Sequence, residues 1–335
     1  MRRRLMRILA GTSRGVFKLD EQDASRVLEG GRIIELATIG ERVFAGTGDG
    51  LHVSDDRGNT WSFAGLGGRE VWQVRGASDG TLYAGTAPSG LYKSTDNGDS
   101  WVEVTTLGAL ARDGGWGIPL EPPIPGRARA LVVDSRNPVH LWVGVEVGGI
   151  AETRDGGESW EVGLPGGNPD LHMMFAHPEQ PDVLYASTGY GRLDGVAEMV
   201  EPNAGVFRSD NGGRDWTYAW RGITPRYSRP MCVDPRVPFG LTVASAPTAF
   251  SSYRDGTGAG AMLFRSTDGG ESWRSLCDQD HSPSRANFHG LAVDPENRGG
   301  VLVGTDTGEL WRVSDDAQWQ PRASGLPAVL AITTA

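Results

Sequence analysis

The chain has 335 residues, of which 49 are glycine and only two are cysteine, and its formal net charge is −10. The acidic balance argues against nucleic acid and anionic membrane surfaces as main partners. Cys232 and Cys277 cannot form a disulfide framework, so reduced thiols in a cytoplasm are the simplest interpretation. The arginine-rich N-terminus imitates a secretory signal, but Arg7 interrupts its short apolar stretch, and we therefore expect a cytoplasmic protein.

A strand–turn–strand pattern recurs from the N-terminus onward. A small apolar stretch ends in Gly-Thr or a similar pair, a turn follows, and then comes an apolar stretch that usually begins with Gly. Residues 10–17 form the first copy and residues 45–52 the second, and the pattern occurs seven times in all. Repeats of roughly 40–50 residues that hold several short strands are typical of β-propeller blades.

Each unit divides into four expected strands. In the fourth unit these are residues 129–134, 140–145, 149–153 and 159–163, whose alternating and β-branched residues suit strands buried between blades. The first unit lacks an innermost strand, whereas the C-terminus has a spare one at residues 328–333. We expect this spare strand to close the ring as the innermost strand of blade one, because closure removes open sheet edges.

The predicted fold is all-β: one domain, residues 1–335, that forms a seven-bladed β-propeller of four-stranded antiparallel blades. The predicted blades are residues 328–334 with 5–30, 31–65, 69–105, 127–163, 170–220, 227–276 and 285–322.

An octapeptide, Ser/Thr-x-Asp-x-Gly-x-x-Trp, follows the strand pair in most units. Its Asp can accept hydrogen bonds from its own turn, its Gly can take a positive φ, and its Trp can fold back between sheets. A fifth copy has Asn211 in place of the aspartate, and a sixth is shortened to residues 314–319. The full copies are residues 54–61, 94–101, 153–160 and 266–273.

This octapeptide resembles the Asp-box, or BNR repeat, of sialidases, xyloglucan-cleaving glycoside hydrolases, sortilin-type receptors and a photosystem II assembly factor. The resemblance covers nearly the whole chain and implies a propeller, a fold that hosts many functions. Sialidases have six blades and an early Phe-Arg-Ile-Pro motif, and the seven units here lack that motif, so true sialidase activity is not expected. The xyloglucan-cleaving enzymes use a cleft between two propellers, which one propeller cannot build.

Long insertions gather on one predicted face. The octapeptides are turns between the third and fourth strands, and the four longest insertions fall on the opposite face, where long loops are usually functional. These insertions are residues 106–126, 189–204, 247–260 and 277–284, all predicted as loops.

The starts of the innermost strands carry basic residues in one register. Arg129, His172, Arg229 and His289 each lie five positions before an Asp or His that ends the strand. The same register places Glu70 in blade three and Arg32 nearby in blade two. We expect a cationic funnel at the channel mouth, where Arg binds a carboxylate, sulfate or phosphate and His supplies a proton near neutral pH. Alternatively, such a ring only solvates a water-filled channel and ties blades together through ion pairs.

Further side chains on this face are candidates for chemistry. Glu146 and Glu70 are the leading carboxyl pair for cleavage of a glycosidic bond, which needs a separation of about 5 Å or about 6.5–9.5 Å. With His172 and His289 they form the predicted catalytic set, to which the sialidase resemblance adds Tyr227 as nucleophile. Substrate binding is assigned to Arg129, Arg229 and Arg32, with Trp116, Tyr190 and Tyr253 as stacking platforms, although packing at the rim explains these aromatic residues equally well.

No cofactor and no metal is expected, and the weaker alternative is a metal held by His172, His281 and His289, which lack a metal-binding spacing. The favoured function is a sialidase-like or glycoside-hydrolase-like enzyme, a hydrolase or lyase that takes a small anionic or carbohydrate-like ligand in a deep pocket. The alternative is a non-catalytic assembly module that binds a protein through a flat, apolar rim.

Overall fold

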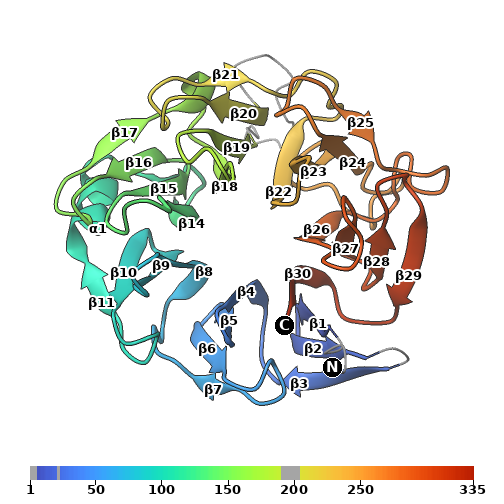
Figure 1. Cartoon of the computed structure of the whole chain (residues 1–335), viewed down its shortest axis with the longest axis horizontal. Helices are drawn as coiled ribbons and strands as arrows, with labels where there is room; N and C mark the ends of the chain where they lie inside the picture. The colour runs from blue at the N-terminus through green and yellow to red at the C-terminus, as the bar shows by residue number, and fades with distance from the viewer. Residues whose placement is uncertain (1–5, 21–22, 190–203) are drawn as a thin grey trace.

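Seven four-stranded antiparallel sheets surround a central channel in the computed structural model, which describes residues 6–20, 23–189 and 204–335 (Figure 1). This arrangement confirms the predicted all-β, seven-bladed propeller. No helix within these three ranges is long and apolar enough to cross a membrane.

The strands run outward from the channel in each blade. Blade one contains β30 (Val329–Thr334), β1 (Ile8–Thr12), β2 (Gly15–Leu19) and β3 (Ala24–Leu28). Blade two contains β4 (Ile33–Ile39), β5 (Arg42–Thr47), β6 (Gly50–Ser54) and β7 (Ser62–Phe63). Blade three contains β8 (Glu70–Gly76), β9 (Leu82–Ala87), β10 (Gly90–Ser94) and β11 (Val102–Val104). Blade four contains β14 (Arg127–Val133), β15 (Leu141–Glu146), β16 (Gly149–Thr153) and β17 (Glu161–Gly163).

The remaining three blades repeat this order. Blade five contains β18 (Leu171–Ala176), β19 (Leu184–Thr188), β20 (Gly205–Ser209) and β21 (Thr217–Tyr218). Blade six contains β22 (Tyr227–Asp234), β23 (Gly240–Ala246), β24 (Met262–Ser266) and β25 (Arg274–Ser275). Blade seven contains β26 (Phe288–Val293), β27 (Val301–Thr305), β28 (Leu310–Val313) and β29 (Trp319–Ala323).

The C-terminal strand closes the ring, as predicted. β30 pairs with β1, so that Ile332 lies opposite Ala10. Val329 is fully buried and Ile332 is 7% exposed. Because the first and last strands of the chain share one sheet, they close the ring between blades one and seven, and β1 has no unpaired inner edge.

The octapeptide turns have the expected hydrogen bonds. In blade four, Asp155 accepts bonds from the Ser159 N–H at 3.0 Å and the Thr153 hydroxyl at 2.7 Å. Gly157 has a φ of 97°, and the Trp160 ring packs against the core between blades three and four. In blade five Asn211 performs the aspartate's role, because its side-chain oxygen accepts the Asp215 N–H at 2.9 Å.

The insertion at residues 106–126 is not the plain loop that was predicted. It begins inside helix α1 (Thr105–Asp113) and continues in a hairpin of β12 (Gly117–Ile118) and β13 (Ile124–Pro125). Leu107 and Ala111 lie four residues apart and are buried on one face of the helix, so an amphipathic turn covers blades three and four. A further 3-10 turn, η1 (Pro165–Gly167), precedes blade five.

The long loops and the octapeptide turns lie on opposite faces. On the loop face, the Gly148 N–H in the β15–β16 turn donates to the Pro169 carbonyl in the loop before blade five, at 3.1 Å. On the other face, the Gly156 N–H in the octapeptide turn donates to the Val139 carbonyl at 2.9 Å. Of the insertion at residues 189–204, residues 190–203 lie outside the described ranges.

Candidate binding site at the channel mouth

Every innermost strand has a register shift near its start, where the strand leaves one or two residues without a cross-strand partner. A β-bulge of this kind re-aims a side chain. In β22 the shift spans Arg229 and Pro230. All seven bulge positions line one cavity of about 600 Å³ along the channel. The bulge residues, from blade one to blade seven, are Leu330, Ile34, Trp72, Arg129, His172, Arg229 and His289.

The structure therefore brings together the four basic residues that the strand register singled out, Arg129, His172, Arg229 and His289. The prediction for blade three was wrong, because Trp72 and not Glu70 occupies the bulge. The connection from β8 to β9 leaves 77–81 between the strands, whereas the connection from β14 to β15 leaves 134–140. The connection in blade three is therefore two residues shorter than the one in blade four, and counting back from the second strand of blade three leads to a position two residues before the bulge.

Glu70 and Arg32 flank the bulge ring. Glu70 accepts a hydrogen bond from the Trp72 indole N–H at 3.0 Å and does not line the cavity. Arg32 precedes β4, where Ile34 holds the bulge position, but its side chain still lines the cavity.

Three guanidinium groups surround the Trp72 ring. Arg32, Arg127 and Arg129 lie 5.3, 5.1 and 4.7 Å from the ring centroid, within the range of cation–π attraction. Burial lowers the pKa of Arg32, and the charges of Arg127, Arg129 and Arg229 lower it further, against the opposing effect of Glu70. Mutual repulsion of this kind makes an anion at the mouth favourable.

Glu146 is a buried carboxylate that compensates part of this positive charge. Its two oxygens accept hydrogen bonds from Arg127 at 2.8 Å and Arg129 at 2.9 Å. Burial would raise the pKa of Glu146, but Arg129, His172 and Arg127 together lower it to about 2. Glu146 is therefore ionised at neutral pH, and Arg129 is tied by the kind of ion pair that the alternative interpretation expected.

Arg229, unlike Arg129, forms no ion pair with a carboxylate of the described residues. One of its nitrogens donates to the Ala249 carbonyl at 2.7 Å, and its guanidinium lies 5.2 Å from the Tyr227 ring centroid. Its buried Nε has no hydrogen-bond partner in the described ranges, and the same is true of Arg129 Nε. Unsatisfied buried donors favour a ligand that can accept from them.

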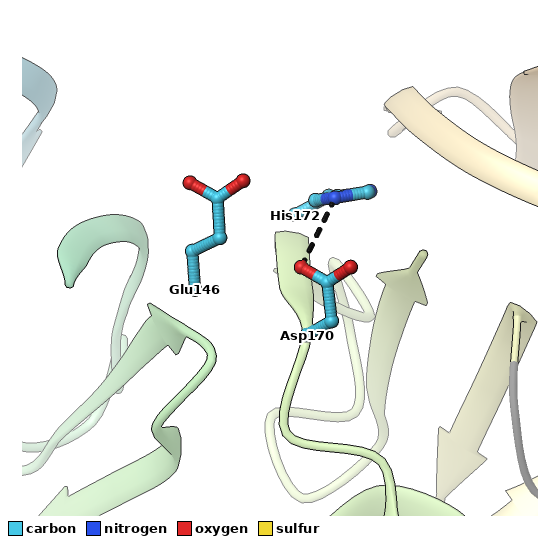
Figure 2. Close-up of side chains that lie close together, drawn as sticks. All are labelled: Glu146, Asp170 and His172. Carbon is cyan, nitrogen blue, oxygen red and sulfur yellow. Dashed lines mark ion pairs between the residues drawn. The ribbon is translucent and has the colours of Figure 1, made fainter. Parts of the chain in front are cut away.

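His172 joins blades five and six beneath this charge. It is fully buried, and its Nδ1 lies 2.6 Å from the Ser228 carbonyl, so Nδ1 carries the proton. Nε2 faces the Tyr227 hydroxyl at 3.4 Å. It also lies 3.4 Å from an Asp170 oxygen, the contact drawn in Figure 2. Burial raises the pKa of Tyr227, which is therefore a neutral phenol at neutral pH. Gly189 packs on both rings, since a Cβ there would lie 2.4 Å from each.

His289 does not supply a proton near neutral pH, contrary to the prediction. Burial, together with the charges of Arg229 and Arg32, lowers its pKa to about 3. Its imidazole is therefore neutral and can only exchange hydrogen bonds with a ligand at physiological pH.

Glu146, Asp170 and His172 could hold a metal ion. One ligand atom from each lies within 4.8 Å of the others, and Figure 2 shows the three side chains together at the end of β15 and the start of β18. Imidazole with carboxylate suits Zn²⁺, but Arg127 and Arg129 already compensate Glu146. The predicted alternative with His281 and His289 was wrong, because Asp278 fixes His281 at 2.6 Å and its ring stacks on Trp319 in the outermost strand of blade seven.

Of the predicted stacking aromatics, Trp116 and Tyr253 do not line the cavity. Trp116 covers Gly148, where a Cβ would meet its ring at 2.8 Å, and packs against the core of blades three and four. The Tyr253 hydroxyl accepts a bond from Arg254 at 3.3 Å in the blade-six insertion. Trp116 therefore packs at the rim, as the alternative interpretation expected, whereas Tyr253 contacts its neighbour Arg254, and Tyr190 lies outside the described residues.

Three residues at the mouth escaped the sequence analysis: Trp72, Arg127 and Asp170. Trp72 follows from the strand pairing, since Gln73 pairs with Gly85 as Ala130 pairs with Gly144, but counting back from that glycine leads again to Glu70 because the connection is two residues shorter. The position of Asp170 depends on an isolated bridge to Glu146 in the preceding blade, which no local sequence pattern indicates.

No protein-family model matches the sequence. An oligoxyloglucan-reducing end-specific xyloglucanase of Emericella nidulans is 28% identical over 246 residues, which are 64% of this chain and 28% of the relative. A xyloglucanase of a Paenibacillus species is 27% identical over 263 residues, 69% of this chain and 24% of the relative. The chain thus spans only about a quarter of the length of these curated relatives.

Solved structures show the same fold. The GH74 xyloglucanase from Xanthomonas campestris has a TM-score of 0.69 at 20% identity, over 95% of this chain and 52% of that one. The structure of YCF48 bound to D1 peptide has a TM-score of 0.54 at 17% identity, over 96% of this chain and 86% of that one. Together with the curated relatives, these similarities support a glycoside-hydrolase-like seven-bladed propeller.

Proposed function

We propose that the protein is a glycoside-hydrolase-like enzyme that acts on a small anionic, sugar-like substrate at the channel mouth. The supporting observation is the bulge ring, which aims Arg129, Arg229, His172 and His289 into one cavity of a chain whose net charge is −10. Arg32 and Arg229 both line the cavity, and neither has an ion pair with a residue in the described ranges, so we assign the substrate carboxylate to these two guanidinium groups.

The residues suggest a division of roles. The planar guanidiniums of Arg32 and Arg229 bind and orient the carboxylate. Ionised Glu146 stabilises the positive charge that develops on the sugar ring when the glycosidic bond breaks. Tyr227, whose hydroxyl lies 3.4 Å from His172 Nε2, donates its proton to the leaving oxygen as the glycosidic C–O bond breaks. Water then adds its hydroxyl to the sugar carbon and returns a proton to Tyr227. Neutral His289 contributes a hydrogen bond to the substrate.

Thermal-shift measurements with matched pairs of sugars test the binding. Glucuronate and galacturonate should raise the melting temperature, whereas glucose and galactose should not. Arg229→Ala should weaken the response to the acids about tenfold or more, on the order of 1.4 kcal/mol. Arg254→Ala is the matched control, since Arg254 belongs to the neighbouring insertion and bonds only at the rim. Equal responses to acids and neutral sugars would overturn the proposal.

Turnover is tested separately with aryl glycosides of the acids that bind. Tyr227→Phe should retain binding and lose most of the release of the aryl alcohol, because the phenol proton is removed while the ring packing on Gly189 remains. Tight binding without turnover in the wild-type protein would refute the enzymatic part.

A second candidate is the non-catalytic binding module. Two observations favour this function. The similarity to the structure of YCF48 bound to D1 peptide covers most of this chain and most of YCF48. In addition, Phe250 is 68% exposed in the insertion whose Ala249 carbonyl accepts a hydrogen bond from Arg229. A co-purifying protein that is lost on Phe250→Ser, in a protein that binds no sugar acid, would favour this function.

A further inference from the structure

We infer that the anionic substrate carries an apolar aryl or alkyl group as its aglycone; this rests on the proposed function and deepens it. The bulge ring has two unlike halves. Blades four to seven contribute the polar set, Arg129, His172, Arg229 and His289. Blades one to three contribute Leu330, Ile34 and Trp72.

Each half is continuous around the channel. The innermost strand β30 contacts β26 of blade seven on one side and β4 of blade two on the other, so the apolar blades adjoin one another (Figure 1). The bulge positions therefore present cations and imidazoles along one arc and apolar side chains along the opposite arc, where Arg32 precedes β4 and also lines the cavity. A ligand that satisfies both arcs has a charged side and an apolar side.

Ile34 and Leu330 are the apolar groups that a substrate would meet. Both are half-buried and line the cavity. Trp72 is only 7% exposed and is already covered by guanidinium groups, so it holds those cations in place and offers little free surface. The apolar part of the substrate should thus lie against blades one and two.

The channel below the mouth continues this apolar surface. Met173, Phe175 and Leu291 line the cavity and are only half-buried, so their remaining apolar surface faces the channel. Glu35 and Arg75 in the channel wall neutralise each other, because Arg75 Nη1 lies 2.5 Å from Glu35 Oε1. A cavity of about 600 Å³ falls within the range of small-ligand pockets and has room for a sugar ring with an aryl group.

Transfer of an aryl group from water to this surface is favourable in proportion to the apolar area of the group. A sugar acid without an aryl group would instead place its hydroxyl groups against the apolar arc, which is unfavourable. The substrate class that fits the mouth is therefore a uronic acid glycoside with an apolar aglycone, with the carboxylate on Arg229 and Arg32 and the aglycone on Ile34 and Leu330.

Calorimetric titration of the full chain with methyl and phenyl thioglucuronides tests this inference, because the two ligands carry the same charge and resist hydrolysis. The phenyl ligand should bind roughly tenfold more tightly or better, in keeping with the burial of its ring. Ile34→Thr should remove most of that preference while it leaves the affinity for the methyl ligand nearly unchanged. Ile39→Thr is the control, since Ile39 lines the same cavity at the other end of β4.

The outcomes separate the two proposals. Equal affinities for the two ligands, both weakened by Arg229→Ala, would overturn the apolar aglycone and leave anion binding intact. A preference for the phenyl ligand that survives Ile34→Thr but not Ile39→Thr would also overturn it. Failure of both ligands to bind would refute the proposed function itself, and the inference with it.

Discussion

Replacement of Ile332 by alanine should destabilise the protein by about 2–4 kcal/mol, in the range of buried Ile-to-Ala substitutions. Ile332 is 7% exposed in the closing strand β30 and packs against Gly290 of blade seven, where a Cβ would approach its side chain to 3.0 Å. The substitution removes apolar contacts between blades one and seven and leaves a cavity at the seam, because the rigid blades relax only partly.

Urea denaturation, followed by tryptophan fluorescence, measures this loss. The matched control is Val162→Ala, because Val162 lies in the outermost strand of blade four and is 48% exposed. It should change the free energy of unfolding by less than about 0.5 kcal/mol. If Ile332→Ala were as mild as Val162→Ala, β30 would not be part of the core in solution, and the reasoning on ring closure would be refuted.

Three further predictions concern the turns and the mouth. Burial would raise the pKa of Asp268, but hydrogen bonds from Ser272 and Ser266 in its turn lower this pKa to about 2. The ionised Asp268 therefore stabilises the fold above the unfolded-state pKa of about 3.9, and this stabilisation is lost as the pH falls through 2. The stability gap between Asp268→Asn and wild type should therefore narrow between pH 5 and pH 2 in urea titrations, and a constant gap would contradict this. The His289 pKa of about 3 lies below the unfolded value of about 6.5, so the unfolded chain binds the extra proton and stability falls as the pH drops below 6.5. NMR should find the His289 ring neutral at pH 5, and a midpoint near 6.5 would show that the ring is solvated. Gly189→Ala should cost about 1–3 kcal/mol and weaken anion binding, because the methyl group would meet the His172 and Tyr227 rings, whereas Gly48→Ala, with nothing within 4 Å, should melt like wild type.

Most of the fold could be predicted from the repeat pattern, because each blade packs against its neighbours through the same residue types at equivalent positions. Gly-Thr pairs, octapeptide turns and a spare C-terminal strand were enough to predict the seven sheets and their closure. Helix α1 was missed because only Leu107 and Ala111 mark its buried face within an insertion that the repeat does not constrain.

Part of the site could be predicted for the same reason. Arg129, His172, Arg229 and His289 share a register, and the fold turns that shared register into convergence. The register failed at Glu70 because the connection between the first two strands differs in length between blades. The neutral state of His289 and the Arg127–Glu146–Arg129 cluster depend on burial and on neighbours in space, which spacing along the chain does not encode.

The most direct test of the central claim is a crystal structure of the protein in complex with glucuronate. The account predicts the carboxylate of the ligand within hydrogen-bond distance of Arg229 and Arg32, at the mouth opposite the octapeptide turns. A ligand bound elsewhere on the molecule, with Arg229 still turned to the Ala249 carbonyl alone, would contradict it.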